Sequence, residues 1–531
     1  MTTVEKYINK GYHNLITILI LLGCIFFTLC ISSCSLSENP EDQIEEEKIY
    51  TSAETVFQHA VASLYSYIGG NTEGQGLAGT VRGVYDLQTF GSDEAIMPTR
   101  GVDWFDGGMW QAMYFHSWNS GHEIIKNSWL YLYKMIALCN RSLETIDKHR
   151  DLLSRMEYER FTAEVRALRA IYYWYLLDLF GNVPIVTSTS VSMNEVKQSS
   201  RLEVYNFVRD ELEESKLYLP QVNSAQKGAY YGRVTLPVAI FILAKLYLNA
   251  KVYSGTPQWE KCLECCDLLS QMHFDLTPDY ADNFIIENET SCENIWTSPM
   301  DRVLYDNYQE CVVRSLHWRH ANACGYIGNN GTSATKTVLV VNHFGQSDQD
   351  WRFNHNYWGG VAIDINNRQV TDREGKILIY APWEVMWDLK GSPYLETAGA
   401  RMRKYEMDRD SNKDGKLVNN DIVLFRYADV LLMQAEAKER LGQSGQAELD
   451  RIRNRARMPL RQSTLENIYD ERLIELAWEG WRRNDMIRFD HYRSEASPND
   501  RVDESDGHTK LFPIPGYAMS TNPNLVQNPG Y

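Results

Sequence analysis

The chain has 531 residues, of which 44% are hydrophobic and 12% aromatic, so it can bury a large core; this excludes both a disordered protein and a small disulfide scaffold. Its 53 Lys and Arg residues are outnumbered by 70 Asp and Glu residues, the formal net charge is −17, and no basic stripe runs along the sequence, so no nucleic acid is expected as a partner. The ten Cys residues are irregularly spaced and do not describe a disulfide framework.

Residues 1–33 have the layout of a secretory signal. Lys6 and Lys10 form a basic start, residues 15–31 are almost entirely apolar, and small residues stand directly before Cys34. This order resembles a bacterial lipobox, in which the Cys is acylated and the preceding segment is removed. We therefore expect a lipoprotein signal peptide with lipidation at Cys34. The alternative is a transmembrane anchor, because the apolar run is long enough to span a bilayer.

Residues 34–48 are expected to form an acidic tether. Six acidic residues and no basic one lie between Ser35 and Glu47, a composition typical of a solvated segment. It also resembles the acidic surface-export signal of Bacteroidetes lipoproteins, although a plain spacer explains it equally well. No linker divides the remainder, so residues 49–531 are predicted to form a single domain.

Helical periodicity dominates two regions, about 122–270 and about 424–489. One apolar stripe recurs at intervals of three and four residues, namely Phe161, Val165, Leu168, Tyr172, Tyr175 and Leu179. Further helices are predicted at about 201–217, 234–250, 258–270, 424–441, 445–457 and 466–489. The expected fold class is therefore mostly α.

The stretch between them, about 275–420, lacks a sustained period and is rich in Asn, Gly and Asp. It is expected to consist of long loops with small β elements, such as residues 337–341 and 377–380. Six Trp residues fall within it: Trp296, Trp318, Trp351, Trp358, Trp383 and Trp387. Aromatic residues in irregular segments are less readily explained as core than those on a helical stripe.

A faint repeat suggests that the helices form pairs. Ala435, Ala447 and Pro459 are spaced by twelve residues, with Leu441-Gly442 at the turn between two helices, much as in a degenerate tetratricopeptide unit. Stacked helix pairs build a scaffold that presents a binding surface.

No motif points to catalysis. P-loop, G-x-S-x-G and H-E-x-x-H strings are all absent from the sequence. Glu471, Glu475 and Glu479 recur every four residues on one predicted helix, where an ion-pair network that joins helices is favoured over the carboxylate pair of a glycosidase. Glu479 is expected to pair with Arg483. Cys262, Cys265 and Cys266 are interpreted as packing residues rather than as metal ligands.

Residues 410–421 match the template of a calcium-binding loop. Asp410, Asn412 and Asp414 stand at positions one, three and five, Gly415 at six, and Asp421 at twelve, while position seven, Lys416, would contribute its carbonyl oxygen. We expect either a structural Ca²⁺ site here or an Asn/Asp turn that needs no ion. No other cofactor is expected.

Several strings together resemble the SusD/RagB outer-membrane lipoproteins of Bacteroidetes. Besides the lipobox, they are residues 163–173 running into 180–184, residues 232–235 and 244–248, residues 425–437, Glu471-Arg472 with residues 479–485, and the closing segments 512–515, 522–523 and 527–531. They cover nearly the whole chain after Cys34 in the family's order. The resemblance implies a SusD-like fold built on tetratricopeptide-like helix pairs.

The resemblance also implies a function. Such lipoproteins are anchored at the cell surface, capture oligosaccharides, and deliver them unchanged to a SusC-like, TonB-dependent outer-membrane transporter. Sugars have apolar faces that stack on aromatic rings and hydroxyl groups that bind fixed polar side chains, so the chain should expose both.

The segment 92–108 resembles a loop near the ligand face in a subset of this family. Trp104 would stack on a sugar, and Asp93, Arg100 and Asp103 would bind hydroxyl groups; the alternative is that the loop merely packs on the helices. Further expected ligand contacts are Trp318, Trp351 and Arg403.

Three other functions stay open at this point. A lipid-anchored glycosidase would cleave the glycan, a peptide-binding importer component would keep the fold with another cargo, and a scaffold would leave ligand recognition to the transporter.

Overall fold

The computed structural model describes residue 13 and residues 46–411, 415–492 and 507–531. Residues 52–531 form one compact unit. Cys34, the apolar run 15–31 and most of the acidic tether lie outside the described residues, so the lipid anchor stays a prediction. Among the described helices, none has the length and apolar character needed to cross a bilayer.

Helices provide the framework of the unit. After α2 (Glu46–Ile49), which precedes the unit, they are α3 (Ala53–Val56), α4 (Ser66–Gly69), α5 (Val84–Phe90), α6 (Met109–Tyr114), α7 (Glu123–Lys148), α8 (Arg155–Leu179), α9 (Arg201–Ser215), α10 (Leu236–Leu248), α11 (Ala250–Ser254) and α12 (Trp259–Ser270). The later ones are α13 (Cys311–Ser315), α14 (Trp318–Ala323), α15 (Lys336–Val341), α16 (Arg352–Asn356), α17 (Tyr427–Arg440), α18 (Gln446–Arg455), α19 (Leu465–Glu475), α20 (Arg482–Arg488) and α21 (Gly516–Thr521).

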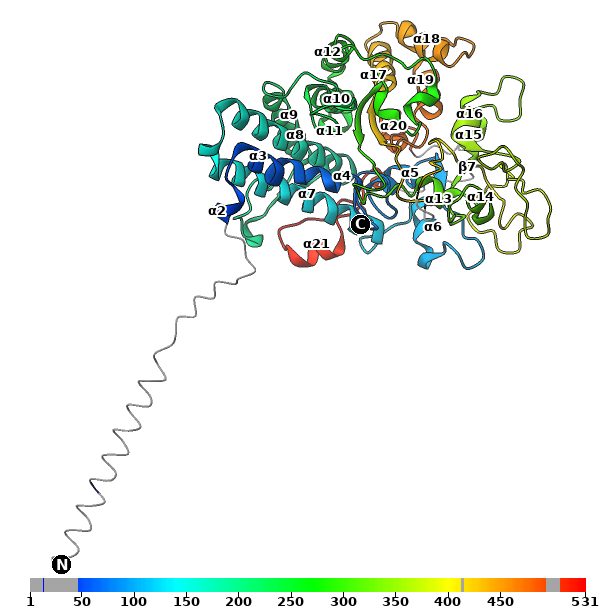
Figure 1. The fold of residues 1–531 in the computed structure, drawn as a ribbon, viewed down its shortest axis with the longest axis horizontal. Coiled ribbons are helices and arrows are strands. Elements are labelled where there is room, and N and C mark those ends of the chain that lie inside the picture. Colours follow the sequence, from blue (N-terminus) through cyan, green and yellow to red (C-terminus); the bar gives the residue numbers. More distant parts are fainter. Residues whose placement is uncertain (1–12, 14–45, 412–414, 493–506) are drawn as a thin grey trace, which may run out of the picture. The chain divides into compact units, whose positions relative to one another are not determined.

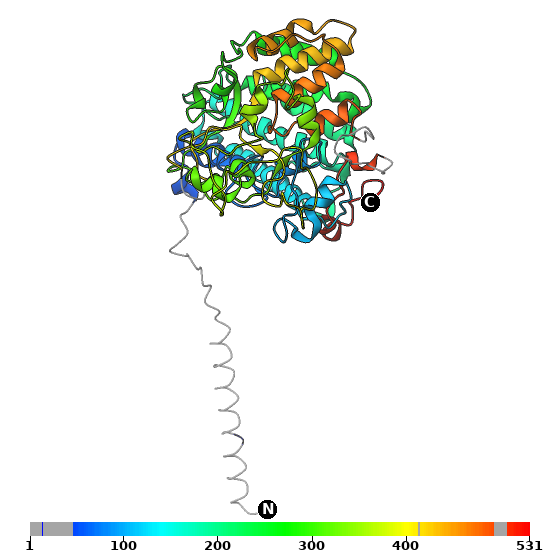
Figure 2. The same ribbon diagram turned by 90° about the vertical axis from the view of Figure 1, so that its right-hand side faces the viewer.

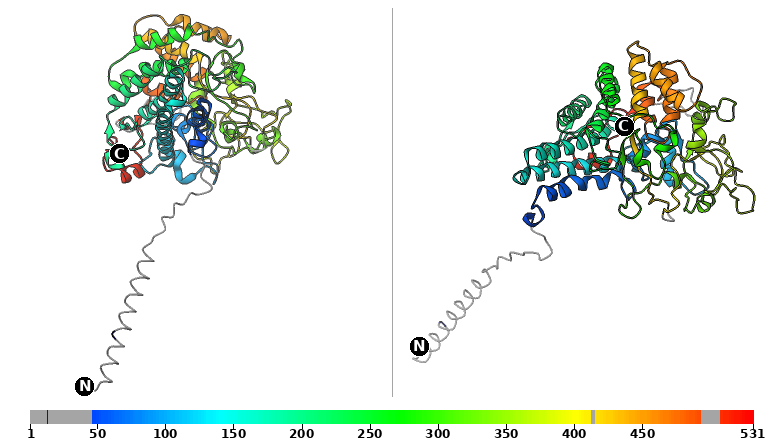
Figure 3. Two further views of the ribbon diagram at one scale, coloured as in Figure 1. Left: turned by 60° about the vertical axis from the view of Figure 1, so that its left-hand side comes forward. Right: turned by 45° about the horizontal axis from the view of Figure 1, so that its top comes forward.

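The long helices pack in chain order. Helix α7 lies against α8, α8 against α9, α10 against α12, α12 against α17, and α17 against α18 and α19, as Figures 1 and 3 show. Local sequence explains the limits of α8: Ser154 and Glu157 form a capping box at its start, and its second half is buried on every side. Gly442 at φ +73° closes the turn between α17 and α18, as predicted. The mostly α fold is confirmed.

Two sequence expectations are wrong. The helix expected at 466–489 is divided into α19 and α20, because Trp478 and Gly480 adopt left-handed backbone, at φ +62° and +75°. The β-like run 337–341 forms helix α15, which packs on α19, so tertiary packing overrides the β propensity of its branched residues.

The predicted carboxylates on α19 form a buried ion-pair network. Glu475 is fully buried and its oxygens lie 2.6 Å from Arg352 Nη1 and 2.7 Å from Arg426 Nη1. Glu471 likewise binds Arg352 and Arg453, each at 2.7 Å. These carboxylates join helices and cannot reach a glycosidic bond, which confirms the predicted network. The partner expected for Glu479 is wrong, because Glu479 pairs with Lys404 and Arg426 while Arg483 lies 3.3 Å from Asp178.

Long loops with two-stranded antiparallel sheets make up the rest. The strands are β1 (Ala95–Ile96) with β5 (Ser333–Ala334), β2 (Val183–Pro184) with β3 (Gln198–Ser199), β4 (Asn294–Ser298) with β8 (Ile422–Arg426), and β6 (Tyr357–Trp358) with β7 (Arg401–Met402). Single backbone bridges also join residues 361–379, including the predicted β run at 377–380. Figure 2 turns these irregular segments, green to yellow, toward the reader.

Candidate functional site

Residues 99–108, the second part of the predicted ligand segment 92–108, have an unusual backbone. Arg100 and Asp103 exchange backbone hydrogen bonds of 3.0 and 3.2 Å across a tight turn. Directly after it, Trp104 and Asp106 adopt positive φ, at +60° and +43°. Such backbone costs of order 1–3 kcal/mol for a residue with a side chain and gathers at ligand-binding segments. The surrounding structure therefore holds this loop in one particular shape.

Trp104 is half-buried rather than free. Its indole N–H donates to the carbonyl of Asn329 at 2.8 Å, and its ring meets Trp110 edge-on at 6.1 Å. A Cβ at Gly331 would lie 2.7 Å from the Trp104 ring, so this glycine lets the loop approach. Only part of the Trp104 ring is accessible to a ligand. Asp103 is exposed beside it.

Asp93 and Arg100 do not lie on an accessible surface, and this corrects the sequence expectation. Both Asp93 oxygens accept from the guanidinium of Arg482, at 2.6 and 3.1 Å, and the side chain is buried. Arg100 is also buried and donates to the carbonyls of Leu395 and Ala398, both at 2.9 Å. Arg100 therefore positions the neighbouring loop 383–398 instead of binding a ligand itself.

That neighbouring loop provides the exposed Trp387, which is one of the Trp residues of the irregular region but is not among the ligand contacts expected from the sequence. Thr99 and the segment 387–389 exchange two backbone hydrogen bonds of 2.9 Å. The Trp387 ring meets Phe115 edge-on at 6.0 Å, and the Trp387 side chain is 45% exposed. We call the exposed rings of Phe115 and Trp387 the aromatic surface. The only feature of the sequence that indicates this surface is the large number of Trp residues in the irregular region 275–420.

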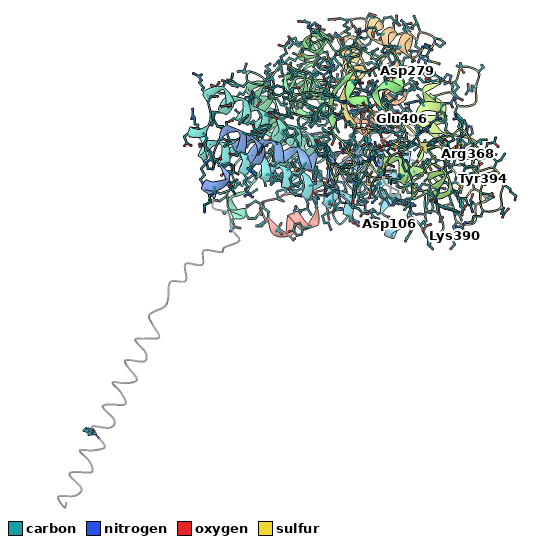
Figure 4. All side chains as sticks on the ribbon, viewed as in Figure 1. Asp106, Asp279, Arg368, Lys390, Tyr394 and Glu406 are labelled. Atoms are coloured by element: carbon teal, nitrogen blue, oxygen red, sulfur yellow. The ribbon has the colours of Figure 1, made fainter. Side chains whose placement is uncertain are left out.

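Two open hollows lie in the loop-rich part. The first has a volume of about 540 Å³ and is lined by residues that include Trp358, Asp364, Arg403, Glu406 and Arg409. The second has about 610 Å³ and is lined by Trp318, Arg319, Asp364, Arg368 and their neighbours. Because Asp364 lines both, they adjoin, and we call them together the arginine groove. Figure 4 labels Arg368 and Glu406 in this part of the molecule, with Tyr394 and Lys390 on the same side.

The structure brings the predicted Trp318 and Arg403 together in the arginine groove. Trp318 is half-exposed, and the guanidinium of Arg373 lies 4.3 Å from its ring centre. Arg403 is exposed and its guanidinium lies 5.0 Å from the centre of the Trp358 ring. Each of the two Trp rings therefore makes a cation–π contact with an arginine, which is a favourable interaction for an indole ring.

The histidines beside the groove add no positive charge at neutral pH. His317 and His320 are buried and His355 is half-buried, and burial lowers the pKa of each to about 4. The charge of the groove therefore comes from its arginines.

Trp351 lies apart from both surfaces, against the sequence expectation. Its indole N–H donates to the carbonyl of Ala456, and its ring meets Tyr280 edge-on at 6.2 Å. It packs on the core, so it joins the loop-rich part to the end of α18.

The expected calcium ligands are only partly described, since Asn412 and Asp414 lie outside the described residues. The Lys416 carbonyl accepts from Gln309 N–H at 2.8 Å, and Asp421 is buried with one oxygen accepting from Met300 N–H at 2.7 Å. Burial raises the pKa of Asp421 to about 7. Across the described parts of the chain, no group of three or more His, Cys, Asp or Glu side chains is arranged to hold a metal. The calcium loop stays a prediction.

Family models match two separate parts of the chain, in order. The model described as "Starch-binding associating with outer membrane" matches residues 84–248, and the model described as "SusD family" matches residues 392–531. The chain belongs to the SusD/RagB family. The first match includes the loop 99–108, and the second includes part of the loop that carries Tyr394.

Relatives of this SusD-family chain agree over most of its length. It is 27% identical to the starch-binding protein SusD of Bacteroides thetaiotaomicron over 410 residues, which cover 70% of this chain and 73% of the relative. It is 25% identical to SusD-like protein P25 of Formosa agariphila over 553 aligned positions, which cover 95% and 97%.

Solved structures show the same fold. A laminarin-binding SusD-like protein matches with a TM-score of 0.71 at 21% identity, covering 91% of this chain and 100% of that one. Surface glycan-binding protein A of Bacteroides thetaiotaomicron, solved with laminarihexaose, also gives 0.71 at 20% identity, covering 90% and 100%. The chain therefore has a SusD-like fold.

Proposed function

We propose that this SusD-family chain captures oligosaccharides on its aromatic surface and passes them on without cleaving them. The observation that carries the proposal is the pair Trp387 and Phe115, whose rings meet at 6.0 Å with 45% and 37% of their side chains exposed. Flat aromatic rings stack on the apolar faces of sugars, and large exposed aromatic residues on rigidly held loops are typical of recognition sites. Relatives named for binding starch and laminarin support the same ligand class.

The proposal includes the location and the partner. A lipid anchor at Cys34 would hold the chain at the outer membrane, as the description of the matching family model supports. A SusC-like, TonB-dependent transporter would receive the sugar. A surface protein that binds reversibly and does no chemistry needs such an acceptor.

Calorimetry with the full chain in detergent tests the proposal. The wild-type chain should bind at least one member of a polysaccharide panel, and Trp387→Ala should weaken that binding by ~1–3 kcal/mol, the effect of removing an aromatic anchor at a recognition site. Tyr517→Ala is the matched control, because Tyr517 is 58% exposed on α21. That variant should bind like the wild type.

Two outcomes contradict the proposal. Release of reducing ends from the polysaccharide would identify a glycosidase. Binding of peptides alone, with no response to any glycan, would favour the peptide-importer alternative.

A further inference from the structure

Four arginines around the arginine groove lack an acidic partner. Among the described residues, no carboxylate forms an ion pair with Arg319, Arg373, Arg403 or Arg409, whereas Arg352, Arg426 and Arg472 in the core each pair with two or more. The chain as a whole carries a net charge of −17. Unpaired guanidinium groups gathered in one place in so acidic a protein call for a specific explanation.

The acidic residues of the groove do not neutralise them. Asp364 accepts from two backbone N–H groups of its own turn and pairs with Arg368 at 2.8 Å. Glu406 is exposed, and one of its oxygens accepts from Ile286 N–H at 3.0 Å. Among the residues that line the groove, Glu406 thus offsets one of the three charges of Arg319, Arg403 and Arg409, and the lining keeps a net positive charge.

Two of these arginines are held with their donors available. The guanidinium of Arg373 lies over the Trp318 ring and that of Arg403 over the Trp358 ring, and a cation–π contact of this kind uses none of the guanidinium N–H groups as a hydrogen-bond donor to a carboxylate. Among the described residues, the Arg403 guanidinium donates one hydrogen bond, to the Asn354 carbonyl at 3.0 Å. The N–H groups of a guanidinium can donate two parallel hydrogen bonds to the paired oxygens of a carboxylate or a sulfate.

We propose that the arginine groove binds anionic groups of the glycan, so that the ligand is an acidic polysaccharide carrying uronic acid carboxylates or sulfate esters. This inference rests on the proposed glycan-binding function and adds the substrate class. The aromatic surface provides stacking that any sugar can use, and the groove selects for charge. Loop 394–398 connects the two, because Arg100 holds its backbone on one side and Glu396 lies 3.2 Å from His317, next to Trp318, on the other.

Matched pairs of polysaccharides test the inference with the full chain in detergent. Polygalacturonate is compared with its methyl ester, and dextran sulfate with dextran, by calorimetry at low and high salt. We expect one charged member to bind about tenfold or more tightly than its neutral partner, with the difference shrinking as salt screens it. The first pair reports a carboxylate ligand and the second a sulfate ligand.

Substitution then localises the effect. The double variant Arg373→Gln/Arg403→Gln should lose that preference and keep its affinity for the neutral member, whereas Arg155→Gln, which changes an 88% exposed arginine at the start of α8, should change neither. Equal affinity for charged and neutral partners, or a preference that survives the double substitution, would overturn the inference. If no glycan binds, or if Trp387→Ala has no effect, the proposed function itself fails.

Discussion

Glu94 is a carboxyl group enclosed in the core. One of its oxygens accepts from Trp478 N–H at 2.5 Å, and the other has no hydrogen-bond partner among the described residues. Burial raises the pKa of Glu94 to about 7. Its neighbour Asp93 pairs with Arg482. Glu94, which has no cationic partner of its own at hydrogen-bond distance among the described residues, is accommodated best when protonated.

Glu94→Gln is predicted to change the pH dependence of stability. A carboxyl group whose pKa rises on folding, here from 4.5 to about 7, contributes stability that is present below pH 4.5 and is lost as the pH passes about 7. The Gln variant should therefore unfold at nearly the same urea concentration as wild type at pH 5, and be more stable by up to ~3 kcal/mol at pH 8. Glu260→Gln, at an exposed position of α12, is the control. A Gln variant that is less stable at both pH values would refute this.

At this scale the sequence predicts residue types better than their positions. The segment 92–108 is predicted from its resemblance to a loop of the family, and Trp318 from its place in an irregular segment. The prediction that Asp93 and Arg100 contact the ligand is wrong because local sequence does not reveal their partners. These partners, Arg482 and the carbonyls of residues 395 and 398, lie hundreds of residues away in the sequence. Only the folded chain brings those partners together.

Helix α19 is the element that carries the buried charge network. Burial opposes ionisation of Glu475, but Arg455, Arg426 and Arg352 outweigh it and hold the pKa of Glu475 well below its usual value. Stability from this group is therefore present above about pH 4.5 and is lost only in strong acid, as the pH falls through the depressed pKa. The network joins α16, α18, α19 and β8.

Glu475→Gln is predicted to destabilise the chain by about 3–5 kcal/mol, because it leaves buried guanidinium groups without compensation. Thermal unfolding at pH 7 measures the effect. Glu466→Gln on the same helix is the control, since its side chain is 72% exposed and should change stability by less than ~0.5 kcal/mol. If the Glu475 variant has the same melting temperature as the control variant, the ion-pair network contributes little to the stability of the chain.

The loop 410–421 is the element for which the sequence predicts a Ca²⁺ site. If it binds Ca²⁺, a chelator should lower the melting temperature of the full chain, because an ion bound only by the folded state stabilises that state. Asp410→Ala should abolish the response to the chelator. An unchanged melting temperature with and without the chelator would favour an ion-free turn.

Across the whole molecule, periodic segments were predictable and irregular ones were not. The stripe on α8 and the α17–α18 turn follow from local sequence, because helix period and capping act within a few residues. The aromatic surface depends on the contact between Thr99 and residues 387–389, which joins distant segments. No local pattern encodes that contact. The helical framework thus fixes where the loops begin and end, and the loops determine what is bound.

A structure of the full chain with a bound oligosaccharide is the sharpest test of glycan binding at the aromatic surface. We predict an intact sugar chain whose ring stacks on the Trp387 indole beside Phe115, with any acidic substituent directed to Arg373 or Arg403. A sugar bound away from both the aromatic surface and the arginine groove, or a cleaved oligosaccharide in the site, would show that the proposed function is wrong.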